Sequence, residues 1–208
     1  MYFGENLAVD DGHLIELPLE EGQTPLDPDE AHGLKLNWVA SRADLNDAEA
    51  ANIIRGMRWA QRQIRRVDTC VESEGFLRSL HERMFGQVWQ WAGTFRNTER
   101  NIGVAPYQIA VQLRQLFENV GAWQEFATYS LDEQAARLHH QLTYIHPFPN
   151  GNGRCSRVMA DMYLLRHGAP MFTWGPAPHG ADVRRTYLMA IRCADAGDLG
   201  PLLNFVRS

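Results

Sequence analysis

The sequence predicts an all-α protein, a mainly helical bundle with one small β-hairpin. Apolar residues recur at helical spacing in several separate segments of the 208-residue chain. Residues that typically start and stop helices stand at the ends of these segments. A short stretch rich in β-branched and turn residues, 92–106, reads instead as a hairpin. With 45% hydrophobic and 22% charged residues, the chain can bury an ordinary globular core.

The amino-terminal part divides into an arm and a helix. Residues 1–30 are acidic and punctuated by Gly and Pro, so an irregular or partly extended arm is expected. Residues 44–65 show helical spacing, and Ser41 or Asp44 can cap the start of that helix. The residues that carry this spacing are Leu45, Ala48, Asn52, Ile53 and Trp59.

Two helices flank the expected β element. After a break at Glu74-Gly75, residues 76–91 carry the apolar series Leu77, Leu80, Met84, Phe85, Val88 and Trp89. Residues 92–106 then predict a small hairpin or flap that ends at Pro106. Helical spacing resumes over about 107–120, with Ile109, Leu113, Leu116, Phe117 and Val120.

The next helix has clear signals at both ends. Ser130 and Glu133 form the pattern of a capping box, in which each side chain bonds the other residue's backbone N–H. The helix should end near Ile145, because Pro147 restricts His146 to an extended conformation.

Helices complete the chain. One is expected from about 153 to 167, stopped by Gly168, and another over about 181–196. An apolar tail at 199–206 follows.

Composition argues against several classes of protein. A net charge of −5 disfavours a broad nucleic-acid or anionic-membrane surface, so neither partner is expected. Three scattered cysteines give no disulfide framework, which fits a reducing, cytoplasmic location. No long apolar segment spans a membrane and no signal peptide is apparent. His139 and His140 lack the pattern of a zinc-binding helix.

Residues 146–157 carry the strongest functional signal, His-Pro-Phe-Pro-Asn-Gly-Asn-Gly-Arg-Cys-Ser-Arg. Glycines can point successive N–H groups into one anion-binding concavity, and a helix that starts here adds its positive dipole end. Arg154 and Arg157 can hold phosphate oxygens, and His146 suits a general base. A plain glycine turn, a structural histidine and a solvated arginine pair are the alternatives.

This stretch resembles the Fic signature, H-x-F-x-[DE]-G-N-G-R-x-x-R. It matches at His146, Phe148, Gly151, Asn152, Gly153, Arg154 and Arg157, and it departs where Asn150 replaces the acidic residue. The likeness extends over roughly residues 75–206. The blocks 24–30 and 44–59 resemble the bacterial Fic subgroup named mobile mystery protein B, which hints at toxin-like use by analogy.

The resemblance implies a division of the chain and an activity. It implies a Fic-type catalytic domain at 75–208, after an N-terminal arm at 1–43 and an N-terminal helical extension at 44–74. The implied activity is protein adenylyl transfer, in which His146 deprotonates a Ser, Thr or Tyr hydroxyl of a target protein and AMP moves from ATP to that oxygen.

The remaining roles are also implied by the resemblance. Gly151, Asn152 and Gly153 would form the phosphate nest, with the Asn152 amide orienting the α-phosphate. Arg157 would bind the γ-phosphate, and Arg154 the β-phosphate or the turn itself. Phe148 would anchor the turn in the core.

Asn150 stands where the family's acidic residue binds Mg²⁺. An amide oxygen adds no negative charge, so weaker affinity for Mg²⁺ or Mn²⁺ is expected. A slow adenylyltransferase, a transferase with another nucleotide, metal or kinase-like preference, and a nucleotide-binding regulatory module with little catalytic power all remain open.

The resemblance also implies partners. The flap, with Ile102, Gly103 and Val104, would dock an extended segment of the target by strand addition, unless it is an ordinary surface hairpin. Glu74 and Glu49 are candidates for an inhibitory carboxylate that pairs with Arg157, although an ordinary surface carboxylate is the more common role for a residue of this kind. A separate antitoxin-like inhibitor is the other expectation.

Overall fold

The computed structural model describes residues 33–176 and 180–208, and the arm expected at 1–30 lies outside these ranges. The described elements are α2 (Arg42–Gln63), α3 (Glu74–Phe85), the 3₁₀ turn η1 (Pro106–Gln108), α4 (Ile109–Glu125), α5 (Leu131–Ile145), α6 (Asn152–Arg166), α7 (Ala181–Asp195) and α8 (Gly200–Val206). The all-α prediction is therefore confirmed, with boundaries within a few residues for most helices.

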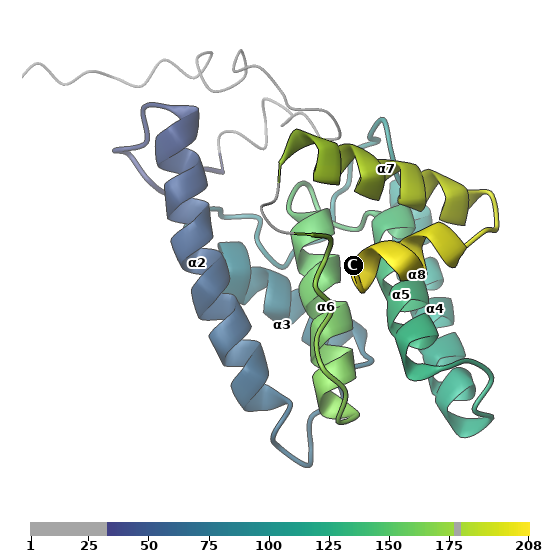
Figure 1. Ribbon diagram of the computed structural model, residues 1–208. Coiled ribbons are helices and arrows are strands. Elements are labelled where there is room, and N and C mark those ends of the chain that lie inside the picture. The colour runs from purple at the N-terminus through teal and green to yellow at the C-terminus, as the bar shows by residue number, and fades with distance from the viewer. Residues whose placement is uncertain (1–32, 177–179) are drawn as a thin grey trace, which may run out of the picture.

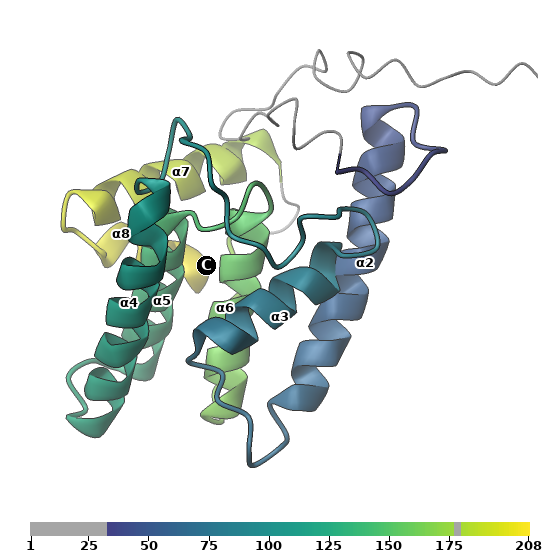
Figure 2. The ribbon, with the colours of Figure 1, turned by 180° about the vertical axis from the view of Figure 1, so that it is seen from behind.

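Helix α6 runs through the middle of the molecule (Figure 1). Helices α2 and α3 lie on one side of it and α5 and α4 on the other, while α7 crosses one end of the bundle; the view from behind gives the same arrangement (Figure 2). Most of α6 is buried, including Val158, Met159, Met162 and Leu164. A helix covered from several sides is the expected place for a site that needs rigid support.

Serine side chains start three of the helices. Ser41 Oγ accepts from Asp44 N at 3.2 Å, Ser73 Oγ from Phe76 N at 3.1 Å, and Ser130 Oγ from Glu133 N at 3.3 Å. Only half of the expected capping box forms, however, because the Glu133 carboxylate bonds Arg137 instead, at 2.7 and 3.0 Å.

The expected helix over 76–91 ends earlier, at Phe85. The chain beyond it bonds residues near the amino terminus: Lys35 N donates to Val88 O and Gln90 N to Gly33 O, each at 2.8 Å. A single antiparallel bridge joins Leu34 to Trp89. Hydrogen bonds to residues 33–35 thus replace the backbone hydrogen bonds of a continued helix. The side chains of Val88 and Trp89 are still buried in the core.

The expected hairpin does not form in residues 92–106, which contain no strand. Its backbone groups bond the connection between α5 and α6 rather than each other: Arg96 N donates to Pro147 O at 2.9 Å and Val104 N to Ile145 O at 3.3 Å. The segment is an irregular loop, called the flap loop below, and it lies beside the site as predicted.

The described helices contain none with both the length and the apolar character to cross a bilayer. The same residues hold no cluster of three or more His, Cys, Asp or Glu side chains placed to bind a metal ion.

Helices α2 and α3 pack closely at Gly56, because a Cβ on this residue would stand 2.5 Å from Met84 Cγ and 2.8 Å from Met84 Cα.

Candidate active site

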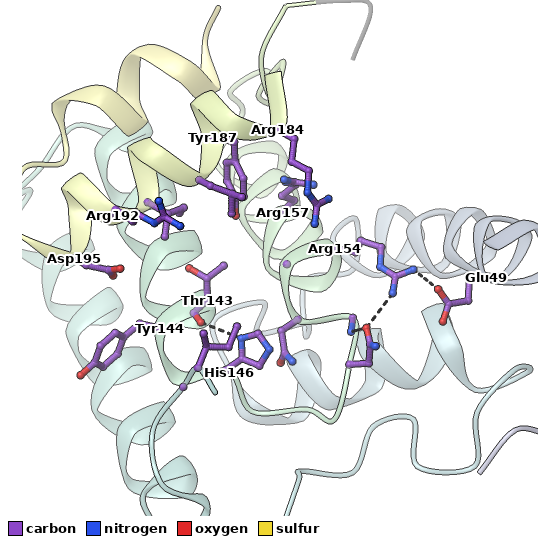
Figure 3. Close-up of a pocket in the computed structure, with 18 of the residues that line it drawn as sticks. Glu49, Thr143, Tyr144, His146, Arg154, Arg157, Arg184, Tyr187, Arg192 and Asp195 are labelled. Carbon is purple, nitrogen blue, oxygen red and sulfur yellow. Dashed lines mark hydrogen bonds and ion pairs between the residues drawn. The ribbon is translucent and has the colours of Figure 1, made fainter. Parts of the chain in front are cut away.

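A cavity of about 620 Å³ lies where the end of α5 and the start of α6 face α2, the flap loop and α7 (Figure 3). Its lining brings together residues far apart in the sequence: Leu45, Asn46, Glu49, Trp89, Ile102, Gly103, Thr143, Tyr144, His146, Asn150, Gly151, Asn152, Gly153, Arg154, Arg157, Arg184, Tyr187, Leu188, Ile191, Arg192 and Asp195. The signature stretch thus borders a real cavity, and α2 and α7 complete it.

His146 caps α5 in the left-handed region, with φ 53° and ψ 59°. The helix ends at Ile145 as predicted, but the extended conformation predicted for His146 is wrong. His146 N still donates to Leu142 O at 3.1 Å. Arg96 Nε donates to His146 O at 2.6 Å, so tertiary bonds hold a conformation that the following proline alone does not favour.

Arg96 organises this corner of the molecule, although it was not among the expected functional residues. Its buried guanidinium donates to His146 O, to Thr98 O at 3.0 Å, and to Val104 O. One side chain therefore ties the flap loop to the end of α5. Polar residues, Asn97-Thr98-Glu99-Arg100, follow Arg96 directly, so the local sequence does not mark it for such a role.

The imidazole of His146 is buried at the cavity wall and contacts Thr143 O through Nδ1 at 3.3 Å. Burial, with the positive charges of Arg96 and Arg100, lowers the pKa of His146 to about 4. The ring is neutral at pH 7. A carbonyl oxygen only accepts, so Nδ1 carries the hydrogen and Nε2 has the lone pair that a base requires.

Phe148 is buried and fixes the turn from below. Its ring stacks on His81, with centroids 3.7 Å apart and planes inclined by 17°. The His81 ring accepts from Gly93 N and donates to Asn150 O, both at 3.0 Å. Because one ring bonds both the flap loop and the turn, His81 is a structural residue of the site that the sequence did not single out.

Helix α6 begins directly at the turn. Its N-cap, Gly151, has φ 77° and lies so close to Phe85 that a Cβ would stand 2.6 Å from the ring, and no side chain caps the helix. The Asn152 amide holds the turn through both of its ends: Oδ1 accepts from Phe148 N at 2.9 Å and Nδ2 donates to Phe148 O at 2.7 Å. The α-phosphate contact expected from this amide stays a prediction, and the backbone N–H groups of the first turn are suited to an anion.

Arg154 pairs with Glu49 of α2, and its Nη2 donates to Asn150 Oδ1 at 3.3 Å (Figure 3). Glu49 is buried, and its Oε1 accepts from Trp89 Nε1 at 2.7 Å. Of the two candidate inhibitory carboxylates, Glu49 reaches the cavity, but it meets Arg154 instead of Arg157. Glu74 lies on the surface of α3, 3.6 Å from Arg78, and does not line the cavity.

Arg157 projects into the cavity beneath α7 (Figure 3). Its guanidinium lies over the ring of Tyr187, with Cζ 4.4 Å from the centroid. No ion pair with Arg157 occurs within the described residues. In the flap loop, Ile102 and Gly103 line the cavity, whereas Val104 is buried behind it.

The fold and this turn define a Fic-type domain. Residues 72–164 match the model of the Fic/DOC family, so the chain contains a Fic/DOC family domain. The assignment to the mobile mystery protein B subgroup stays a prediction.

Curated relatives are protein adenylyltransferases. Fic-1 of Caenorhabditis briggsae is 31% identical over 134 residues, which are 61% of this chain and 25% of the relative. Fic of Drosophila melanogaster is 32% identical over 132 residues, 61% of this chain and 26% of the relative. The chain therefore aligns with about a quarter of the length of the curated relatives it matches.

Solved structures agree on the fold. A fragment of Fic-1 from Caenorhabditis elegans has a TM-score of 0.59 and 26% identity, and the match covers 76% of this chain and 48% of that one. The AMPPNP-bound BepC protein of Bartonella tribocorum has a TM-score of 0.63 at 19% identity and covers 94% of this chain and 96% of that one, which supports the fold alone.

Proposed function

We propose that this protein transfers AMP from ATP to a Ser, Thr or Tyr hydroxyl of a target protein. The observation that carries the proposal is that a neutral imidazole, His146, borders the same cavity as the uncapped start of α6 and Arg157. A base next to a site built for polyphosphate is the minimum that nucleotidyl transfer to an alcohol requires. The naming of the curated relatives supports the same reaction.

The proposed step uses three groups of the chain. His146 Nε2 takes the proton of the target hydroxyl, and the oxygen attacks the α-phosphorus of ATP. The bond from that phosphorus to the bridging oxygen breaks, and pyrophosphate leaves. The first turn of α6 binds the α- and β-phosphates, and Arg157 binds the γ-phosphate and the charge that develops on the leaving group.

Asn150 does not fit a metal ligand as it stands. Its Oδ1 accepts from Gly151 N at 2.6 Å and from the cationic Arg154 at 3.3 Å. A divalent cation would have to displace both donors and lie beside a guanidinium. We therefore propose that Mg²⁺ or Mn²⁺ arrives on the phosphates of ATP, and we assign no protein step to it.

Glu49 is proposed as a built-in restraint on the site. Its carboxylate neutralises Arg154, the arginine nearest the α6 start, and is itself fixed by Trp89. ATP phosphates would compete with Glu49 for this guanidinium. An antitoxin-like partner remains a separate prediction.

The flap loop is proposed to dock the target protein. Ile102 is 45% exposed at the cavity edge, so it can contact an incoming segment of the target.

Cys70, Cys155 and Cys193 are all free thiols, which supports the proposal of a cytoplasmic location.

The competing functions predict different labels. Purified protein is incubated with cell lysate and ATP labelled at either the α- or the γ-phosphate, with Mg²⁺ or Mn²⁺. Protein label from the α position alone supports AMP transfer. Label from the γ position instead indicates kinase-like transfer. ATP binding without any label indicates the regulatory module, which Asn150 and the Glu49–Arg154 pair specifically favour.

Replacing His146 separates catalysis from binding. His146→Ala should abolish α-label transfer while ATP affinity stays within about twofold, because the imidazole acts on the hydroxyl and not on the nucleotide; general bases contribute roughly 10²–10⁴-fold to rate. Transfer that persists in this variant removes His146 from its proposed role.

A further inference from the structure

Two aromatic rings, and not a carboxylate, hold Arg157. Its Cζ lies 4.4 Å from the Tyr187 ring centroid and 5.7 Å from that of Trp174. Its Nε is buried without a hydrogen-bond partner. Arg154 is different, since Glu49 already neutralises it. A guanidinium restrained by ring faces keeps its charge and its outward N–H groups for a ligand.

A buried carboxylate fixes the ring of Trp174. Trp174 Nε1 donates to both oxygens of Asp161, at 3.2 and 3.1 Å. Asp161 is only 6% exposed and also accepts from Phe172 N at 3.1 Å. It stands four residues after Arg157 on α6, so one helix carries both the arginine and the group that orients its neighbouring ring.

A buried histidine fixes the ring of Tyr187. His139 Nε2 lies 3.0 Å from Tyr187 Oη, and the His139 ring meets Trp174 edge to face with centroids 4.7 Å apart. The His139 side chain is fully buried and does not contact solvent. His139 thus connects the two rings that hold Arg157.

The backbone at Trp174 shows that this arrangement is imposed. Its φ is 59°, a region that bulky residues rarely adopt unless the surroundings determine it. Thr173 N and Trp174 N both donate to Val206 O, at 2.9 and 3.4 Å, which ties the segment to α8. The ring is therefore set by contacts on several sides.

We propose that Asp161, His139, Trp174 and Tyr187 are positioning residues that hold Arg157 for the terminal phosphate, and so set a preference for a triphosphate over a diphosphate. This inference rests on the proposed function. The first turn of α6 serves the phosphates nearest His146, whereas Arg157 lies one turn further along the helix. A diphosphate lacks the terminal phosphate that would reach Arg157. The two rings should therefore affect the binding affinity of the triphosphate and not that of the diphosphate.

The test compares ATP with ADP in titration calorimetry. Wild type should prefer ATP. Trp174→Leu should lower that preference roughly tenfold, with ADP affinity unchanged, because it removes a ring from a partly desolvated cation. Trp174→Phe should retain most of the preference. Trp123→Leu, which removes a partly buried indole of α4 that does not line the cavity, is the matched control and should leave the preference for ATP unchanged.

The outcomes separate two failures. A wild type that binds neither nucleotide, or both equally, overturns the assignment of Arg157 in the proposed function, and this inference with it. A wild type that prefers ATP while Trp174→Leu keeps the same preference overturns only the positioning role. If Trp174→Leu does not fold, Tyr187→Phe, which loses the hydroxyl near His139, should still reduce the ATP-to-ADP ratio measurably, and an unchanged ratio counts against the proposal.

Discussion

The carboxylate of Glu49 pairs with Arg154 across 105 positions of sequence. Both oxygens are engaged, one with the guanidinium and one with the indole N–H of Trp89. A buried carboxylate with two partners is costly to disrupt and positions α2 against the turn. The same contact occupies an arginine for which the phosphates of ATP would compete, so stability and ligand affinity oppose each other at this residue.

Glu49→Gln should therefore raise ATP affinity and lower stability. The amide still accepts from Trp89, but the ion pair is lost, and we expect about three- to tenfold tighter ATP binding and a loss of roughly 1–2 kcal/mol in the free energy of unfolding. Calorimetry and urea unfolding measure the two quantities. Glu74→Gln, on the surface of α3, is the control and should alter neither. Weaker ATP binding in Glu49→Gln would show that Glu49 is no restraint.

At the scale of elements, the flap loop and the end of α5 form one unit. Gly103 has φ 95°, and a Cβ there would stand 2.6 Å from His146 Cβ and 2.8 Å from Arg96 Nη2. The loop can lie against His146 only because this residue is glycine. A change at Gly103 is therefore expected to shift the His146 ring.

Gly103→Ala should damage transfer more than nucleotide binding. The added methyl group and the positive φ together should cost about 1–3 kcal/mol of stability and displace His146, with α-label transfer falling by at least about tenfold. Gly121→Ala in α4 is the control, because a Cβ there meets nothing within 4 Å. This change should raise the free energy of unfolding by up to about 1 kcal/mol, since alanine is favoured over glycine inside a helix. Full activity in Gly103→Ala would contradict this coupling.

The elements also show what the sequence can specify. Ser130 and Gly168 marked helix ends correctly because caps act within a few residues, and Gly168 has φ 79°. The signature turn was found because its residues are contiguous. The sequence did not identify the roles of Arg96 and His81, or the rings around Arg157, because packing brings these residues to the site from other parts of the chain. Arg96 and His81 come from 50 or more positions away, Tyr187 comes from α7, and Trp174 comes from the segment between α6 and α7. The prediction of a hairpin was wrong for the same reason, because the backbone of residues 92–106 forms hydrogen bonds with the end of α5 and the turn after it.

At the scale of the whole molecule, buried histidines dominate the response to acid. Burial lowers the pKa of His81 to about 3, of His146 to about 4, and of His139 well below 6.5. Each is neutral when folded and takes up a proton only when unfolded as the pH falls below about 6.5. Their contribution is complete above that pH and is lost as the pH falls towards the folded pKa values.

Asp161 acts in the opposite sense. Burial raises the pKa of Asp161 to about 6, so its favourable contribution is complete below about 3.8 and is lost as the pH rises through 6. Three histidines outweigh one aspartate between these limits. The folded protein should therefore lose stability on acidification.

The free energy of unfolding should fall from pH 7 to pH 4.5, by about 1.4 kcal/mol per pH unit for each net proton taken up on unfolding. Urea titrations across this range measure the slope. His81→Gln can still bond Gly93 N and Asn150 O, and it should reduce the slope by close to one proton. A slope that His81→Gln leaves unaltered would mean that His81 is not held neutral in the fold.

The most direct measurement is a crystal structure of the protein with a non-hydrolysable ATP analogue. We expect the phosphates to lie against the first turn of α6, with the terminal phosphate at Arg157 and the α-phosphorus facing the His146 ring. An analogue bound with its phosphates elsewhere, or a His146 ring directed into the core and away from the ligand, would contradict this expectation.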